Sequence, residues 1–149
     1  LLNPVVTGLI FTLSFSLWHV PTLYEAALAN KTIHILEHLT IWLPSLGVAW
    51  NLFSSSKVLP PVSYPGRLLM LFILMIAQLP VFGILTMSGR VLYPTYEWAP
   101  RIIDLSPIDD QVLGGLLMKV GGMLFVLPIF GYCFFQWSKL TQSDDPEME

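Results

Sequence analysis

Residues 112–137 read VLGGLLMKVGGMLFVLPIFGYCFFQW, and Lys119 carries the only charged side chain among them. A helix of roughly 20 apolar residues crosses the hydrocarbon core of a bilayer, so this stretch is long enough to be a transmembrane helix. Lys119 lies more than two turns inside it, where a bare ammonium group costs roughly 3 kcal/mol on insertion scales. The lysine must therefore face the bundle, a polar cavity or a partner protein, or snorkel. Glu37 is the only carboxylate at a matching depth in the other apolar runs, and we expect it to contact Lys119.

Three further apolar runs precede this stretch, at residues 4–18, 33–53 and 68–87. Hydrophobic residues make up 54% of the chain and charged residues only 11%, whereas an average soluble domain is about 25% charged. The composition therefore predicts an all-α fold, a polytopic membrane helix bundle with four transmembrane helices. We expect residues 1–138 to form one transmembrane domain and residues 139–149 to form an acidic polar tail without fixed structure.

Four spans that alternate in direction place residues 19–32 and 88–111 on the same side of the membrane. Lys and Arg are equally numerous on the two sides, so the positive-inside rule does not by itself choose an orientation. Lys57 and Arg67 crowd one short linker on the opposite side, which favours that side as the cytoplasmic one. We therefore expect residues 19–32 and 88–111 to face outward.

A short helix over residues 21–30 is expected to lie in the membrane interface, because its apolar residues recur at helical spacing. Pro21 suits the first turn of this helix, since its missing N–H would have no partner there. Glu25 is expected on the solvated face. Before the last span, Ser106 is a good N-cap and Pro107 a good first helical residue, so we expect the last helix to begin there.

Three histidines and a glutamate lie close together in the sequence at the outward side of the first two spans. On a helix, His34 and His38 project from one face, and Glu37 lies on the flank of that face. Two imidazoles at this spacing can bind one metal ion, and His19 is the natural third ligand if the first two spans pack side by side. Imidazole suits copper and zinc alike. Glu37 could be a ligand, an acceptor that orients an imidazole, or a general base.

Two residues of the last span extend this set of candidates. Asp110 is a partner for the helix dipole that could also reach the histidines, and Met118 is either a packing residue or a soft ligand for copper(I). The predicted metal ligands are therefore His19, His34, Glu37, His38, Asp110 and Met118. The chain has no basic patch and no glycine-rich phosphate loop, so it is not expected to bind nucleic acid or nucleotides.

Four segments together carry a resemblance to a known family: WHVPTLYEAAL (18–28), HILEHL (34–39), LYPTY (92–96) and LSPIDDQVLGGLLMK (105–119). They are similar to the CtaG-type cytochrome c oxidase assembly factors, which are bacterial polytopic membrane proteins implicated in copper delivery to haem-copper oxidases. The likeness covers nearly the whole chain and corresponds to the C-terminal four spans of that family. The signature of the family maps onto His19, Pro21, His34, Glu37, His38, Ser106, Pro107, Asp110, Gln111, Gly115 and Met118.

The resemblance implies a non-enzymatic factor of the bacterial inner membrane that binds copper, rather than zinc, at its periplasmic or extracellular face. Its implied partners are membrane lipid and a haem-copper oxidase subunit or another large membrane complex. Lys119 departs from the family pattern, which tends to have a large apolar or aromatic residue there, and favours an alternative function. That alternative is a structural accessory subunit of a larger respiratory or photosynthetic complex. A third hypothesis is an intramembrane zinc hydrolase, because HxxEH is also the inverted zincin motif.

Overall fold

The computed structural model describes residues 3–54, 56–60, 62–101 and 104–144, and within them it contains helices and no strand. The predicted all-α fold is therefore confirmed. The helices are α1 (Pro4–Trp18), α2 (Pro21–Ala29), α3 (Lys31–Phe53), α4 (Tyr64–Ala77), α5 (Leu79–Met87), α6 (Pro94–Glu97) and α7 (Pro107–Asp144).

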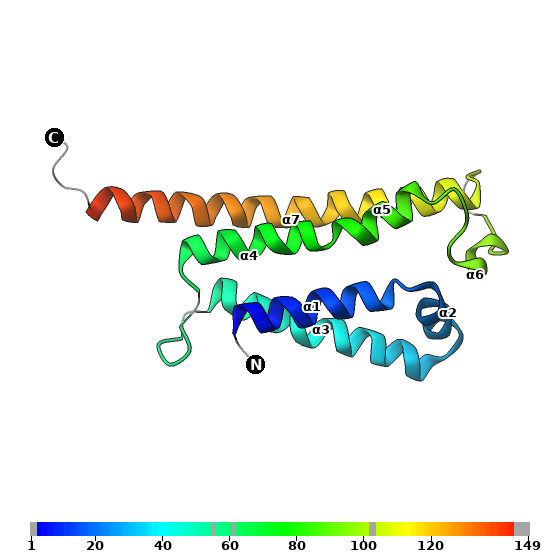
Figure 1. Ribbon diagram of the computed structural model, residues 1–149, viewed down its shortest axis with the longest axis horizontal. Coiled ribbons are helices and arrows are strands. Elements are labelled where there is room, and N and C mark those ends of the chain that lie inside the picture. The colour runs from blue at the N-terminus through cyan, green and yellow to red at the C-terminus, as the bar shows by residue number, and fades with distance from the viewer. Residues whose placement is uncertain (1–2, 55, 61, 102–103, 145–149) are drawn as a thin grey trace.

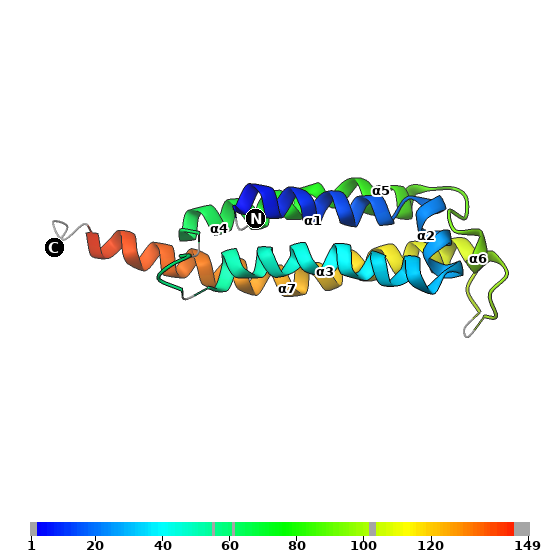
Figure 2. The ribbon, with the colours of Figure 1, turned by 90° about the horizontal axis from the view of Figure 1, so that it is seen from below.

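The long helices form two pairs that run along a common axis (Figures 1 and 2). Helix α1 packs against α3, while α4 and α5 together pack against α7, and contacts between α1 and α4 join the two pairs. Helices α2 and α6 lie at one end of the bundle, and the linker between α3 and α4 lies at the other end with the C-terminal part of α7 (Figure 1). Residues 19–32 and 88–101 therefore meet at one end, as their predicted placement on one side of a membrane requires.

Two helical segments are long and apolar enough to cross a membrane, namely α4 with α5 (Tyr64–Met87) and residues Pro107–Ser143 of α7. Helices α1 and α2 add a third if they are counted as one span bent by 76°. Helix α3 has 23 residues, which is long enough, but the polar side chains in its first half reduce its apolar character. The predicted number of four spans is therefore not confirmed for the described residues.

The helix starts follow the expected local chemistry. Ser106 caps α7, because its Oγ accepts a hydrogen bond from the Asp109 N–H at 3.1 Å and Pro107 is the first helical residue. This start agrees with the prediction from sequence. Asn30 caps α3 in the same way, since its Oδ1 accepts from the N–H groups of Thr32 and Ile33.

Polar side chains join α1 and α3 at both ends of their contact. At the end near α2, Trp18 is 7% exposed and its Nε1–H donates to Thr40 Oγ1 at 2.7 Å. At the other end, Asn51 is 3% exposed and its Nδ2 donates to Thr7 Oγ1 at 3.1 Å. Each bond satisfies a polar group that would otherwise be costly to bury. The two bonds also fix the register of the pair.

Lys119 reaches the break between α4 and α5. Its Nζ donates to the main-chain carbonyl of Met75 at 3.0 Å, so the predicted contact with Glu37 is wrong. The break follows from Pro80, which has no N–H to donate to the preceding turn. An interrupted helix exposes carbonyl groups inside the bundle, and the ammonium group supplies a donor for one of them.

Candidate functional site

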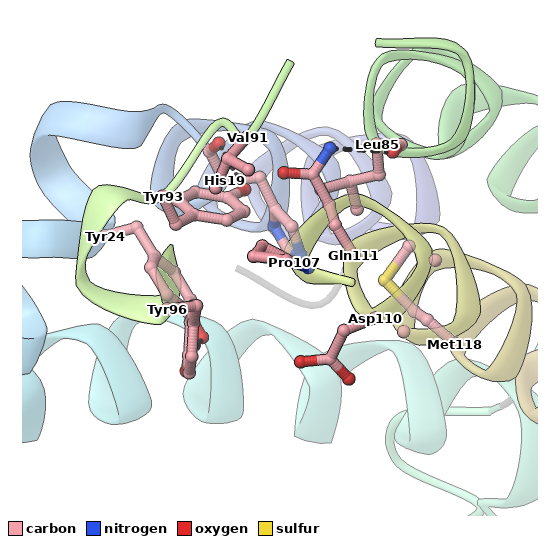
Figure 3. Close-up of a pocket in the computed structure, with 12 residues that line it drawn as sticks. His19, Tyr24, Leu85, Val91, Tyr93, Tyr96, Pro107, Asp110, Gln111 and Met118 are labelled. Atoms are coloured by element: carbon pink, nitrogen blue, oxygen red, sulfur yellow. Dashed lines mark hydrogen bonds between the residues drawn. The ribbon is translucent and has the colours of Figure 1, made fainter. Parts of the chain in front are cut away.

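A cavity of about 330 Å³ lies at the end of the bundle that holds α2 and α6 (Figure 3). Its walls come from the end of α1, from α2, from α5 and the loop that follows it, from α6, and from the N-terminal part of α7. The lining residues are His19, Tyr24, Leu85, Val91, Tyr93, Tyr96, Pro107, Asp110, Gln111, Gly114, Gly115 and Met118. All of them except Leu85 and Val91 belong to segments 18–28, 92–96 and 105–119. Three of the four segments that carry the family resemblance thus converge on one site.

The close approach of α5 and α7 closes one wall of the cavity. Gly115 is buried, and a Cβ atom at this position would lie 2.9 Å from Thr86 Cγ2 and 3.2 Å from Leu85 Cβ. Only glycine allows this approach. Nothing lies within 4 Å of a Cβ at the neighbouring Gly114, so of this pair it is Gly115 that sets the distance between the helices.

Gln111 holds the loop that covers the cavity. Its Oε1 accepts from the Leu92 N–H at 2.7 Å, and its Nε2 donates to the carbonyl of Leu85 at 3.1 Å and to that of Arg90 at 3.4 Å. The amide therefore connects α7, the end of α5 and the loop. The predicted set of metal ligands did not include Gln111, although the family signature contains it.

Three tyrosines form the roof of the cavity. Tyr93 OH donates to the His19 carbonyl at 2.9 Å, Tyr24 OH and Tyr96 OH share a hydrogen bond of 2.9 Å, and the rings of Tyr24 and Tyr93 lie 4.4 Å apart. Burial raises the pKa of the Tyr93 hydroxyl, and Tyr96 raises that pKa further. Tyr93 therefore remains a hydrogen-bond donor above neutral pH. The three tyrosines lie in the segments WHVPTLYEAAL and LYPTY, but nothing in either segment predicted that they would meet.

Glu25 joins α2 to α6 at the mouth of the cavity. Its carboxylate accepts from the Thr95 N–H at 3.3 Å and also from the Thr95 hydroxyl. These contacts are exposed, so Glu25 combines the expected solvated position with a hydrogen-bonding partner in α6. Together with the bond between Tyr24 and Tyr96, this contact holds α2 and α6 side by side across the mouth of the site.

His19 presents one free nitrogen in the cavity. Its Nδ1 lies 2.6 Å from the carbonyl oxygen of Phe15, which can only accept a hydrogen bond, so Nδ1 carries the proton of the neutral ring. Nε2 then has its lone pair available, and it has no hydrogen-bond partner among the described residues. Metal-binding histidines are usually held in this way, with the second nitrogen donating to a carbonyl or carboxylate.

Asp110 and Met118 also line the cavity, but in the part of the chain that the structure describes Asp110 already has a polar partner and Met118 does not. Asp110 forms an ion pair with Arg101, with 3.1 Å between Nη1 and Oδ2, and its side chain is 49% exposed. Arg101 also donates to the carbonyl of Tyr96, so the ion pair connects α7 to the roof. The thioether of Met118 makes no competing polar contact among the described residues.

The remaining predicted ligands lie outside the cavity, on α3. His34 and His38 are exposed, with their Nε2 atoms 2.9 Å apart, and Glu37 is half-buried beside them. The structure therefore divides the six candidates into two sets and does not bring His19 to the α3 pair. Among the described residues, no three His, Cys, Asp or Glu side chains gather in a way that could hold a metal ion.

The fold and the cavity define a helical bundle with apolar helices of membrane-spanning length and a site lined in part by signature residues at one end of the bundle. A family model described as cytochrome c oxidase caa3 assembly factor (Caa3_CtaG) matches residues 1–140. The chain therefore belongs to this family of assembly factors, which confirms the resemblance drawn from the sequence. No curated protein and no solved structure matches it.

Proposed function

We propose that this protein assists the assembly of cytochrome c oxidase by holding copper(I) in the cavity and delivering it to the oxidase. The observation that carries the proposal is the free Nε2 of His19, which Phe15 fixes by its bond to Nδ1. This nitrogen shares the cavity with the thioether of Met118. Imidazole and thioether are donors that suit copper(I).

The residues present fit copper as donor types. His19 and Met118 would bind the ion. Copper would be the cargo that this chain delivers to the oxidase, and the chain itself would carry out no catalytic step. Asp110 would add a negative charge that Arg101 already partly balances. A site with few protein ligands suits delivery, because the ion must also leave it. The three tyrosines would shield one side of the bound ion, and the open side of the cavity would let the ion leave.

The proposed location is the bacterial inner membrane, with the cavity at the periplasmic or extracellular face. The apolar helices support a membrane location, and the family supports an oxidase subunit as the partner that receives copper. Helices α2 and α6 lie at the end of the bundle that contains the cavity (Figure 1). In this arrangement they would be the first elements that an outward-facing partner meets.

The test measures copper(I) bound by the purified full chain in detergent under reducing conditions, with X-ray absorption to identify the ligand atoms. We expect His19→Gln to lose a nitrogen ligand and Met118→Leu to lose the sulfur ligand. Met123→Leu is the matched control, because Met123 lies in the same helix and outside the cavity. A sulfur ligand that persists in Met118→Leu, or disappears in Met123→Leu, would show that the cavity is not the copper site.

The same variants give a test of delivery in cells. We expect the oxidase from cells that carry His19→Gln or Met118→Leu to contain less copper per haem than the oxidase from cells with the parent protein. Met123→Leu should leave this ratio unchanged. Normal copper in the oxidase from both cavity variants would refute delivery through this site.

A further inference from the structure

His34 and His38 form a second candidate site, separate from the cavity. Both belong to α3 and lie one helical turn apart, and neither lines the cavity. Their rings are tilted by 40° to one another, with 4.6 Å between centroids and 2.9 Å between the two Nε2 atoms. Two imidazole nitrogens at this distance can share a proton, or they can both bind a metal ion that lies off the line between them, about 2.0 Å from each nitrogen.

The distance between the nitrogens restricts the geometry of that ion. Two imidazole–metal bonds of about 2.0 Å to atoms 2.9 Å apart enclose an angle of about 90° at the metal. Neighbouring ligands in tetragonal copper(II) subtend this angle, whereas a tetrahedral ion such as structural zinc needs a wider one. The pair as it stands is therefore suited to copper(II).

The surroundings of the pair leave the other coordination positions open. Both side chains are exposed, and among the described residues no third His, Cys, Asp or Glu completes a site. Glu37 lies three positions after His34 and is therefore its neighbour on the helix surface. The carboxylate of Glu37 accepts no hydrogen bond from the described residues, so its charge is available to offset that of a cation.

We propose that His34 and His38 bind one copper(II) ion on the surface of α3, with water in the remaining positions. This site is distinct from the cavity in its ligands, in its exposure and in the oxidation state that it prefers. It does not depend on copper being bound in the cavity. Glu37 acts as a nearby negative charge and not as a ligand.

The test is a titration of the purified full chain in detergent with copper(II) sulfate, without reductant, followed by electron paramagnetic resonance. We expect an axial tetragonal spectrum with hyperfine structure from two nitrogens. His34→Gln and His38→Gln should each weaken binding at least about 10- to 100-fold, a loss seen even for groups one step removed from a metal. Ile35→Gln is the matched control, because Ile35 is exposed beside His34 on the same helix and has no metal-binding atom, and it should leave the spectrum and the affinity unchanged.

Two outcomes would overturn the proposal. One is unchanged copper(II) binding in the double variant of His34 and His38, and the other is loss of binding in Ile35→Gln. Both α3 histidines are exposed, so their replacement should leave the fold intact, and circular dichroism of each variant checks this. Because the cavity is tested with copper(I) and with Met118→Leu, failure of one site is distinguishable from failure of the other.

Discussion

Replacing Gly115 by alanine should destabilise the contact between α5 and α7, although alanine is the better helix former. The added Cβ would lie 2.9 Å from Thr86 Cγ2 and 3.2 Å from Leu85 Cβ. Thr86 cannot rotate freely, because its hydroxyl donates to the carbonyl of Phe82 at 2.8 Å, and Leu85 Cβ moves only with the backbone. Overpacking of this kind costs about 1–3 kcal/mol.

Gly114→Ala is the matched control for this prediction. Both variants gain the same helix propensity, about 1 kcal/mol, and nothing lies within 4 Å of a Cβ at Gly114. The difference between the two variants therefore isolates the steric cost. We expect Gly115→Ala to be less stable than Gly114→Ala by about 1–3 kcal/mol.

The assay is reversible unfolding in mixed detergent micelles with increasing dodecyl sulfate, followed by circular dichroism. The free energy of unfolding is compared for the parent protein and for the two alanine variants under identical conditions. Equal stability of Gly115→Ala and Gly114→Ala would refute the close approach of α5 and α7 at this position. Greater stability of Gly115→Ala than of the control would refute it more strongly.

Three further predictions use the same unfolding assay. Gln111→Leu leaves main-chain partners in the loop unpaired and should cost about 1–3 kcal/mol; faster proteolysis of residues 88–101 should accompany it. Trp18→Phe removes the hydrogen bond to Thr40 and should therefore lower the free energy of unfolding by about 1 kcal/mol. In a background that carries Thr40→Val, the same substitution should no longer show this contribution. Lys119→Met leaves the Met75 carbonyl without its donor, which costs about 1–3 kcal/mol, but it also removes a charge that is desolvated inside the bundle, which offsets part of this loss. We therefore expect a small net change for Lys119→Met and a large loss for Lys119→Glu, whereas a large loss in Lys119→Met would contradict this balance.

Local sequence patterns predicted the helices well, because helix formation here depends on neighbours within a few residues. The apolar runs match α1, α3, α4 with α5, and α7, and the turn before Pro21 separates α2 from α1. Ser106 and Pro107 marked the start of α7 because capping involves only adjacent main-chain groups. The number of spans was less predictable, since α3 combines sufficient length with polar side chains in its first half.

The site was only partly predictable. His19, Asp110 and Met118 belong to the predicted set and line one cavity, whereas the tyrosine roof and the role of Gln111 depend on contacts between segments far apart in the chain. Tyr93, for example, donates to the carbonyl of His19. No local pattern specifies a partner at such a separation.

The sequence by itself determined that this chain is an all-helical membrane protein, where its main helices lie, and which family it resembles. Composition, apolar length and capping residues act locally, so they can be read without a structure. Only the tertiary structure decided that His19 lies apart from His34 and His38, and that Lys119 bonds to Met75. Helices α1 and α3 do pack side by side, but His19 lies in the cavity beside α7, whereas His34 and His38 are exposed on α3. Lys119 meets Met75 because α7 packs against α4. The physical reason is that the direction in which each side chain leaves its packed helix decides its partners, and no local pattern specifies that direction.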